Sequence, residues 1–163
     1  MTERVVGPFG RNTGHPFQLF PNQRSTARRF TVRIGQGSGD AQGFIVVKGI
    51  EIEWFNGERV SVYNRPQPDD SSSTFEFQEG ERASWTVWAG WRIVRFEIST
   101  TLGRTWAFGG TSGTRFPNIV SNGQLIGMEL SSGWEVDWAN ITFLVHGGRE
   151  AEAEAEADVQ EAG

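Results

Sequence analysis

The sequence predicts a single all-β domain, and three observations support this expectation. Apolar and polar residues alternate in strand-length runs such as Arg92–Thr100, which is the pattern of a half-buried strand. The 163 residues include 21 glycines, 12 phenylalanines and 7 tryptophans, a composition typical of aromatic strands joined by tight turns. No stretch of the sequence with the length of a helix carries an apolar period of 3.6 residues. The length suits one domain and is too short for two.

The first expected strands are Phe30–Ile34 and Phe44–Trp54, where apolar residues alternate with polar ones. The dipeptide Asn56-Gly57 then leads directly into Arg59–Tyr63, and an Asn-Gly pair between two such runs is a strong hairpin signal. Pro66–Ser73 is expected to form a polar loop. The remaining expected strands are Thr74–Phe77, Ala83–Trp88, Arg92–Thr100 with its return strand Arg104–Phe108, and Gln124–Leu130 with its return strand Val136–Val145.

Two kinds of internal repeat are visible. Three hairpin units, which start at Gly43, Gly90 and Gly123, each contain an apolar strand, a glycine-containing turn and a return strand. The pattern F-G-x-x-x-G-x-x-F occurs at Phe9–Phe17 and again at Phe108–Phe116. Repetition without a long array predicts a closed, symmetric architecture of a few similar sheets.

The charge distribution divides the chain. Residues 149–163 hold six acidic residues and one arginine, which leaves 14 acidic and 14 basic residues in 1–148. We therefore expect one domain over residues 1–148 and a disordered, acidic, Ala/Glu-rich tail over 149–163. A neutral body lacks the basic stripe that phosphate binding requires, so no nucleic-acid partner is expected.

Several other classes of site are disfavoured. Cysteine is absent and only two histidines occur, which excludes a disulfide framework and argues against a metal centre, and no cofactor is expected. No apolar run reaches 18 residues and the first residues lack a signal-peptide core. These features predict no membrane insertion, and a protein that is cytoplasmic or secreted by an unconventional route.

Three segments resemble those of jacalin-related lectins. The opening Gly7–Phe17 is similar to the glycine-rich start of that family, and Gly80–Phe116 is similar to its middle stretch. Gly123–Phe143 resembles the closing segment with the sugar-binding pattern G-x-x-x-D, here Gly133–Asp137. The resemblance covers Val5–Val145 and implies a β-prism of three four-stranded antiparallel sheets with pseudo-threefold symmetry.

The resemblance also implies a metal-independent carbohydrate site. Its six residues are Gly14, Gly133, Trp134, Glu135, Val136 and Asp137. Asp137 would accept hydrogen bonds from the O4 and O6 hydroxyls of a hexose, because an ionised carboxylate is an acceptor for two hydroxyls. The amides of the three residues before it, and that of Gly14, would donate to sugar oxygens, while Gly133 permits close approach of the backbone. Thr101–Arg104 would lie beside this pocket.

The same resemblance implies a specificity. Galactose preference goes with a cleaved N-terminal loop in the family, whereas this chain is continuous through Gly7–Phe17, so mannose/glucose-type glycans and glycoproteins are the expected partners. A galactose/GalNAc-type lectin is the alternative. Glu135 departs from the family pattern, and it would place an acidic group at the rim and disfavour sialylated glycans. Members of the family commonly assemble through prism faces, so the resemblance implies a homodimer or homotetramer. Trp85, Trp88 or Trp138 could line such a face.

Other interpretations of these residues remain open. Asp137 could instead cap its own turn by accepting nearby amides, and Trp134 could be a packed aromatic residue. A glycosidase would need two carboxylates in a cleft, and Glu135 and Asp137 on one short loop do not predict one, so no enzyme activity is expected. The prism could also be the scaffold of an interaction module without sugar binding, with the acidic tail as the binding element.

Overall fold

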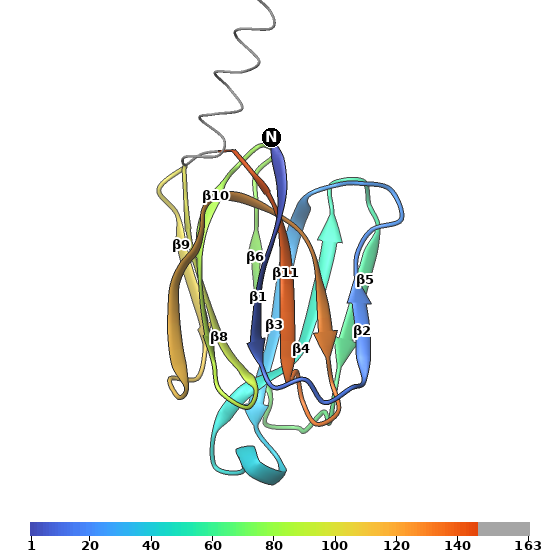
Figure 1. Ribbon diagram of the computed structural model, residues 1–163, viewed down its shortest axis with the longest axis vertical. Helices are drawn as coiled ribbons and strands as arrows, with labels where there is room; N and C mark the ends of the chain where they lie inside the picture. Colours follow the sequence, from blue (N-terminus) through green and yellow to red (C-terminus); the bar gives the residue numbers. More distant parts are fainter. Residues whose placement is uncertain (147–163) are drawn as a thin grey trace, which may run out of the picture.

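The computed structural model describes residues 1–146, which form eleven β-strands and one short 3-10 helix (Figure 1). The acidic tail predicted for residues 149–163 lies outside the described residues. The elements are β1 (Thr2–Gly10), β2 (Pro16–Leu19), β3 (Ala27–Gln36), η1 (Gly39–Ala41), β4 (Ile45–Trp54), β5 (Arg59–Tyr63), β6 (Ser71–Glu76), β7 (Ala83–Ala89), β8 (Ile93–Thr100), β9 (Thr105–Gly109), β10 (Thr114–Ser131) and β11 (Trp138–Val145). Within residues 1–146, no helix is long and apolar enough to span a bilayer.

The strands form three antiparallel sheets of four strands each, which confirms the predicted prism. Strand β10 takes part in two of them, because its first half pairs with β7 while its second half pairs with β2 and β11. The bend lies at Gly123, which is opposite Ala83 in one pairing and opposite Val145 in the other. The sheets have the orders β2-β10-β11-β1, β5-β4-β3-β6 and β9-β8-β7-β10, and they are called the first, second and third sheet below.

The three predicted hairpins are confirmed, and each belongs to a different sheet. The hairpin β10-β11 supplies the two central strands of the first sheet, whereas β4-β5 and β8-β9 each supply a central strand and an edge strand of the second and third sheets. Two expectations about local structure were wrong or incomplete. The predicted polar loop Pro66–Ser73 ends earlier, because residues 71–73 already pair with β3. Strands β1 and β2 were not predicted, since β1 buries only Phe9 and its sequence contains Pro8, so it lacks the alternation of a core strand.

Large aromatic side chains fill the centre of the prism and connect all three sheets. Phe30 of the second sheet packs edge-on against Trp85 and Phe96 of the third, with ring centroids 5.1 Å apart in both pairs. Trp85 also lies 5.4 Å from Phe143 of the first sheet. Such aromatic pairs contribute about 0.5–1.5 kcal/mol each beyond their burial. Trp85 is fully buried, so it cannot line an oligomer face as the sequence had suggested, whereas Trp88 and Trp138 are half-buried.

A buried ion pair fixes the segment between β5 and β6. Lys48 Nζ lies 2.9 Å from Asp70 Oδ1, and their side chains are 1% and 4% exposed. Burial raises the pKa of Asp70, but hydrogen bonds from Tyr63, the Gln67 amide and Lys48 outweigh burial and hold that pKa below its ordinary value. The only lysine of the chain therefore has a structural role.

One end of the prism gathers loops that are far apart in the sequence, and it is called the loop end (Figure 1). Both F-G-x-x-x-G-x-x-F motifs reach this end, where the rings of Phe9 and Phe116 lie 5.2 Å apart. The loops of the loop end span residues 11–15, 37–44, 64–70, 90–92, 110–113 and 132–137. The turn Thr101–Arg104 lies at the opposite end of the prism, where Thr101 N donates to Arg82 O before the start of β7. The expectation that this turn borders the sugar pocket is wrong, because β8 runs away from the loop end, and residues 90–92 take that position.

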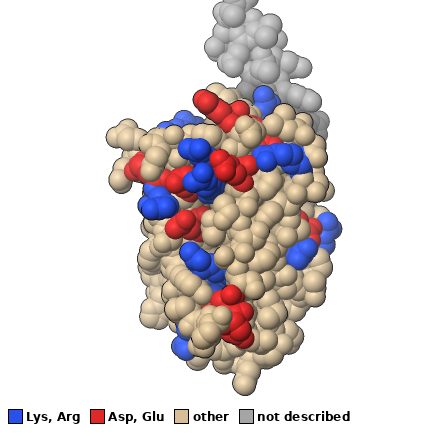
Figure 2. Space-filling model, turned by 180° about the vertical axis from the view of Figure 1, so that it is seen from behind, with Lys and Arg blue, Asp and Glu red and all other residues tan. Residues whose placement is uncertain are grey.

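Figure 2 shows the back of the molecule, on which acidic and basic side chains are interspersed. Several ion pairs of the described residues are exposed on both partners, such as Arg29 with Glu76 at 3.4 Å. Exposed pairs of this kind contribute about 0–1 kcal/mol each, so they add little to the stability of the fold.

Candidate functional site

The loop between β10 and β11 contains the G-x-x-x-D pattern and closes around its own aspartate. Asp137 is fully buried, and its two carboxylate oxygens accept the backbone N–H groups of Trp134 and Glu135, both at 2.9 Å. The Asp137 amide donates to Ser131 O at 2.8 Å. Accepting amides two and three residues earlier fixes a tight turn, so Asp137 determines the shape of this loop.

The loop between β1 and β2 is fastened to this turn, mainly by Thr13. The Thr13 amide donates to Ser131 Oγ at 2.9 Å, and the Gly133 amide donates to Thr13 Oγ1 at 3.1 Å. The Ser132 amide donates to His15 O at 3.0 Å. The two loops form one unit, which we call the double loop (residues 11–15 and 132–137).

A glycine is required where this unit begins. Gly10 has a φ of +84°, and a Cβ at this position would lie 2.1 Å from the carbonyl oxygen of Asp137. The next amide, that of Arg11, donates to the same carbonyl at 2.8 Å. The glycine of the first repeated motif therefore permits the close approach of the two loops.

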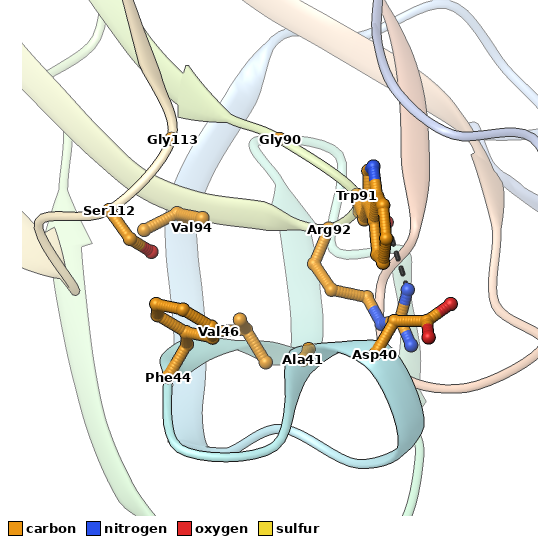
Figure 3. Close-up of a pocket in the computed structure, with 10 residues that line it drawn as sticks. All are labelled: Asp40, Ala41, Phe44, Val46, Gly90, Trp91, Arg92, Val94, Ser112 and Gly113. Atoms are coloured by element: carbon orange, nitrogen blue, oxygen red, sulfur yellow. Dashed lines mark hydrogen bonds between the residues drawn. The ribbon is translucent and has the colours of Figure 1, made fainter.

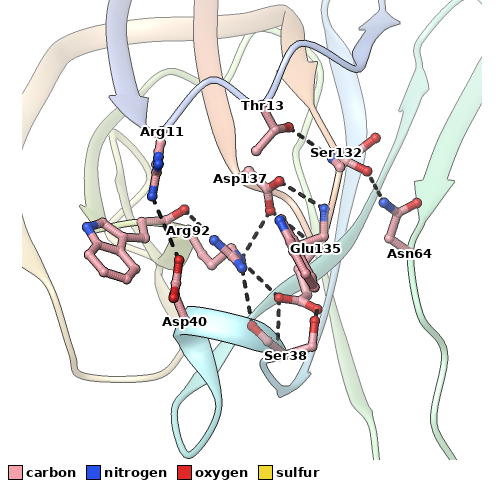
Figure 4. A network of polar contacts seen from close by, with 12 residues as sticks. Arg11, Thr13, Ser38, Asp40, Asn64, Arg92, Ser132, Glu135 and Asp137 are labelled. Atoms are coloured by element: carbon pink, nitrogen blue, oxygen red, sulfur yellow. Dashed lines mark hydrogen bonds and ion pairs between the residues drawn. The ribbon is translucent and has the colours of Figure 1, made fainter.

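Glu135 lies beneath the loop and takes part in a buried charge cluster (Figure 4). Its carboxylate accepts Arg92 Nε at 3.0 Å and the Ser38 hydroxyl at 2.5 Å. Arg92, whose side chain is 3% exposed, also places Nε 3.2 Å from Asp137 Oδ1. The expectation that Glu135 adds an acidic group to the rim is wrong, because a buried arginine compensates it and it does not reach the surface.

Trp134 is the residue of the predicted pattern that presents a large surface to solvent. Trp134 is 43% exposed, and its ring lies next to Gly39, between β3 and β4. The guanidinium of Arg65 lies 5.0 Å from the centroid of the ring, at a distance typical of a cation–π contact. Arg65 has a φ of +52°, which is rare for a residue with a side chain.

The structure brings five of the six predicted residues together in the turn and places Gly14 in the adjoining loop. Their polar groups are engaged within the protein: the Val136 amide donates to Val47 O at 3.0 Å, and the Gly14 amide donates to Asn12 Oδ1 at 2.9 Å. With the two amides on Asp137, all four amides predicted to bind sugar have protein acceptors. Trp134 is the exposed part of this turn, with Arg65 and Arg92 beside its ring, whereas the Asp137 carboxylate is buried and becomes accessible only if the turn opens.

Two important side chains of this region were not predicted. Arg92 and Ser38 contact Glu135 from sequence separations of 43 and 97 residues. Nothing in the local sequence around either residue indicates that it will meet the G-x-x-x-D loop.

Among residues 1–146, no group of three or more His, Asp or Glu side chains is placed to hold a metal ion.

Comparisons with known proteins give a fold but no close relative. A scan against protein families finds no match, and no curated protein sequence matches this one. Among solved structures, a mannose-binding lectin from champedak superposes with a TM-score of 0.66 at 16% identity, covering 89% of this chain and 99% of the lectin. Single-chain recombinant jacalin gives a TM-score of 0.66 at 16% identity, covering 89% of this chain and 96% of that chain.

A lamprey immune protein gives a TM-score of 0.67 at 21% identity, and the match covers 88% of this chain. This chain spans only 44% of the length of the lamprey protein. The shared architecture, together with the three sheets and the double loop, shows that this chain has the β-prism fold of the jacalin-related lectins.

Proposed function

We propose that this protein is a carbohydrate-binding lectin that holds mannose/glucose-type glycans at the double loop without a metal ion. The observation that carries the proposal is the joining of the glycine-rich β1–β2 loop to the G-x-x-x-D turn, with the exposed Trp134 ring beside them. Lectins of the same fold, including the champedak protein, are described as mannose-binding.

The residues of the double loop suit a shallow, neutral ligand. The exposed part of the indole supplies apolar contact for the C–H face of a hexose, and the Arg65 guanidinium, 5.0 Å from the ring centroid, adds hydrogen-bond donors beside it. In this proposal Asp137 acts first by fixing the turn. A direct bond from Asp137 to sugar hydroxyls requires the turn to release one of the two amides that the carboxylate accepts.

A glycan array followed by calorimetry with methyl α-mannoside tests the proposal. We expect mannose-type binding that is lost in Trp134→Ala and weakened in Asp137→Asn. Leu102→Ala is the matched control, because Leu102 is 60% exposed at the opposite end of the prism. Galactose-type binding with the same dependence on Trp134 would keep the site and reject the mannose preference, whereas the absence of binding to any glycan would reject the lectin.

The sugar-free interaction module is the second candidate, and a specific observation favours it. The predicted sugar-binding amides and both oxygens of Asp137 already have partners within the protein. Deleting residues 149–163 separates the two functions, since glycan binding should survive the deletion while an interaction through the tail should not.

We also propose that the protein is not an enzyme and that it acts as a homodimer or homotetramer. Glu135 and Asp137 share one arginine and are both inaccessible to solvent, so they are poorly placed as the two carboxylates of a glycosidase. Turnover of aryl glycosides that disappears in Asp137→Asn would contradict this. Several weak sites in an oligomer would raise the avidity for multivalent glycans, and light scattering of the purified chain measures the oligomeric state.

A further inference from the structure

A cavity of about 300 Å³ lies beside the double loop and belongs to a different set of loops (Figure 3). It opens between the β3–β4 segment, the β7–β8 loop and the β9–β10 loop, so the second glycine motif contributes to it through Ser112 and Gly113. None of the six residues predicted to bind sugar lines it. We call it the side cavity, and its volume is in the range that holds a small organic ligand.

The side cavity has an apolar floor and two exposed aromatic walls. Ala41, Val46 and Val94 line it, are buried, and belong to one apolar cluster. Phe44 and Trp91 are 50% and 53% exposed, although side chains of this size usually bury more of their surface. An exposed ring beside an apolar floor suits a ligand that combines the C–H face of a sugar ring with a methyl group.

Arg92 lines the same cavity and has hydrogen-bond donors that the protein does not use. Its side chain is 3% exposed. Three of its five N–H groups donate to the protein: Nε to Glu135 at 3.0 Å, Nη1 to Trp91 O at 3.0 Å and Nη2 to Ser38 O at 3.2 Å. The other two, one on each terminal nitrogen, have no acceptor within residues 1–146. Because buried donors normally find an acceptor, this arrangement favours a ligand that carries one.

The charges around the side cavity cancel. Asp40 belongs to the lining and lies 3.8 Å from the Arg11 guanidinium, which in turn lies 5.6 Å from the centroid of the Trp91 ring. The two carboxylates beneath the neighbouring turn are likewise matched by two arginines, at 3.0–3.9 Å. Three guanidinium groups therefore balance three carboxylates, so the site selects neither a cation nor an anion by charge. A neutral ligand is the one that suits it.

Asp40 keeps its capacity to accept hydrogen bonds. Its distance of 3.8 Å from Arg11 is too long for a hydrogen bond, and no donor within residues 1–146 bonds its carboxylate. Figure 3 shows the Arg92 guanidinium beside Asp40 at the Trp91 end of the side cavity. A donor and an acceptor side by side, next to an aromatic ring and an apolar floor, are the groups that recognise a neutral sugar with an amide substituent.

We propose that the side cavity binds an N-acetylhexosamine unit. The acetamido carbonyl accepts an N–H of Arg92, and the acetamido methyl group lies on the apolar floor. The hydroxyl on the neighbouring ring carbon donates to Asp40, and the C–H face of the sugar packs against Trp91. This site and this sugar class go beyond the mannose-type site at the double loop, and neither depends on the other.

Three probes test the proposal. Methyl N-acetyl-β-glucosaminide is compared with methyl β-glucoside, which has a hydroxyl in place of the acetamido group, and with N-methylacetamide, which lacks the sugar. Each is titrated to about 100 mM, because a ligand of this size is expected to bind in the millimolar range. The readout is local: the methyl resonances of Val46 and Val94 and the indole N–H resonance of Trp91 in heteronuclear NMR spectra. We expect saturable movement with the N-acetylglucosaminide, and affinities for the other two probes that are lower by about tenfold.

Three variants and one matched control locate the interaction through the same methyl resonances. Trp91→Leu should weaken binding of the N-acetylglucosaminide by about tenfold, and Asp40→Asn by about three- to fivefold. Arg92→Lys keeps the charge but loses the planar set of donors, so it should reduce the preference over the glucoside to about twofold. Asp69→Asn changes an exposed carboxylate outside the lining of the side cavity and should leave binding unchanged.

Several results would overturn the proposal. Equal affinity for the N-acetylglucosaminide and the glucoside would mean that the acetamido group is not recognised, and equal affinity for N-methylacetamide would mean that the sugar is not. Movement confined to the indole resonance of Trp134 would place the ligand at the double loop instead. Methyl α-mannoside keeps the two sites apart, since it should move the Trp134 resonance and leave that of Trp91 in place. If the mannoside moves neither while the N-acetylglucosaminide moves that of Trp91, the mannose site fails and the side cavity stands.

Discussion

Replacing Arg92 by methionine should destabilise the protein more than any exposed substitution. Arg92 is 3% exposed and compensates two carboxylates at once, with Nε 3.0 Å from Glu135 and 3.2 Å from Asp137. Removing one partner of a buried pair leaves an uncompensated charge, which costs about 3–5 kcal/mol of unfolding free energy. Against a typical total of about 5–15 kcal/mol, this loss is large but compatible with a folded variant.

The measurement is urea unfolding followed by tryptophan fluorescence, with the slope m compared between variants. Arg29→Met is the matched control, since Arg29 is 43% exposed and its ion pairs should be worth about 1 kcal/mol or less. Adding Glu135→Gln to Arg92→Met should recover about 1–3 kcal/mol, because one of the two uncompensated carboxylates is then neutral.

Two results would refute this reasoning. A loss below about 1 kcal/mol in Arg92→Met would mean that water or a rearranged loop solvates the carboxylates. Simple additivity in the double variant would mean that Arg92 and Glu135 do not act together. If Arg92→Met does not fold, Arg92→Lys keeps the charge and isolates the geometry of the guanidinium.

The remaining predictions concern the ion pair, the packing of β10 and the double loop. Because the pKa of Asp70 is lower in the folded state than in the unfolded state, ionised Asp70 stabilises the fold above about pH 4, and this stabilisation is lost as the pH falls through the folded pKa. Asp70→Asn should therefore flatten the pH dependence of the free energy of unfolding in urea below about pH 4. Gly127→Ala should lower the free energy of unfolding by about 1–3 kcal/mol, since a Cβ there would lie 2.4 Å from the carbonyl oxygen of Leu19. Gly90→Ala is the control, and it should leave the melting temperature in thermal denaturation nearly unchanged, because its Cβ would meet nothing closer than 3.7 Å. Thr13→Val should cost about 1–2 kcal/mol and raise amide hydrogen exchange across residues 132–134, because it removes the two hydrogen bonds that Thr13 Oγ1 makes with Ser131 Oγ and the Gly133 amide. Unchanged exchange there would contradict the joining of the two loops.

The hairpins could be predicted from sequence because their signals are local. Alternation in Phe44–Trp54 and the Asn56-Gly57 turn determine a pairing between neighbours in the chain. Strand β1 gave no such signal, since it is an edge strand whose partner β11 lies more than 120 residues away. The first half of β10 was missed for a similar reason: residues 114–118 are exposed, and their partner is β7 rather than an adjacent strand.

The candidate site, too, could be predicted only where its contacts join residues that are close in the sequence. The G-x-x-x-D spacing predicts the tight turn, because the amides that Asp137 accepts are two and three residues away. Burial of Glu135 could not be predicted, since it depends on Arg92 and Ser38, which reach the turn from other sheets. A carboxylate on a short polar loop looks exposed from its sequence, and only the tertiary fold supplies the arginine that compensates it.

The strands of the first sheet come from distant parts of the sequence, and this affects the order in which the chain folds. Strands β1 and β2 lie within residues 2–19, whereas their partners in β10 and β11 lie within residues 123–145. The second sheet, by contrast, uses one continuous stretch, residues 27–76. During synthesis the second sheet can form while the ribosome is still translating the third, but the first sheet must wait until β11 emerges. Its closure pairs the most distant segments of the domain, which is a slow class of folding event, and the double loop can be assembled only in that last step.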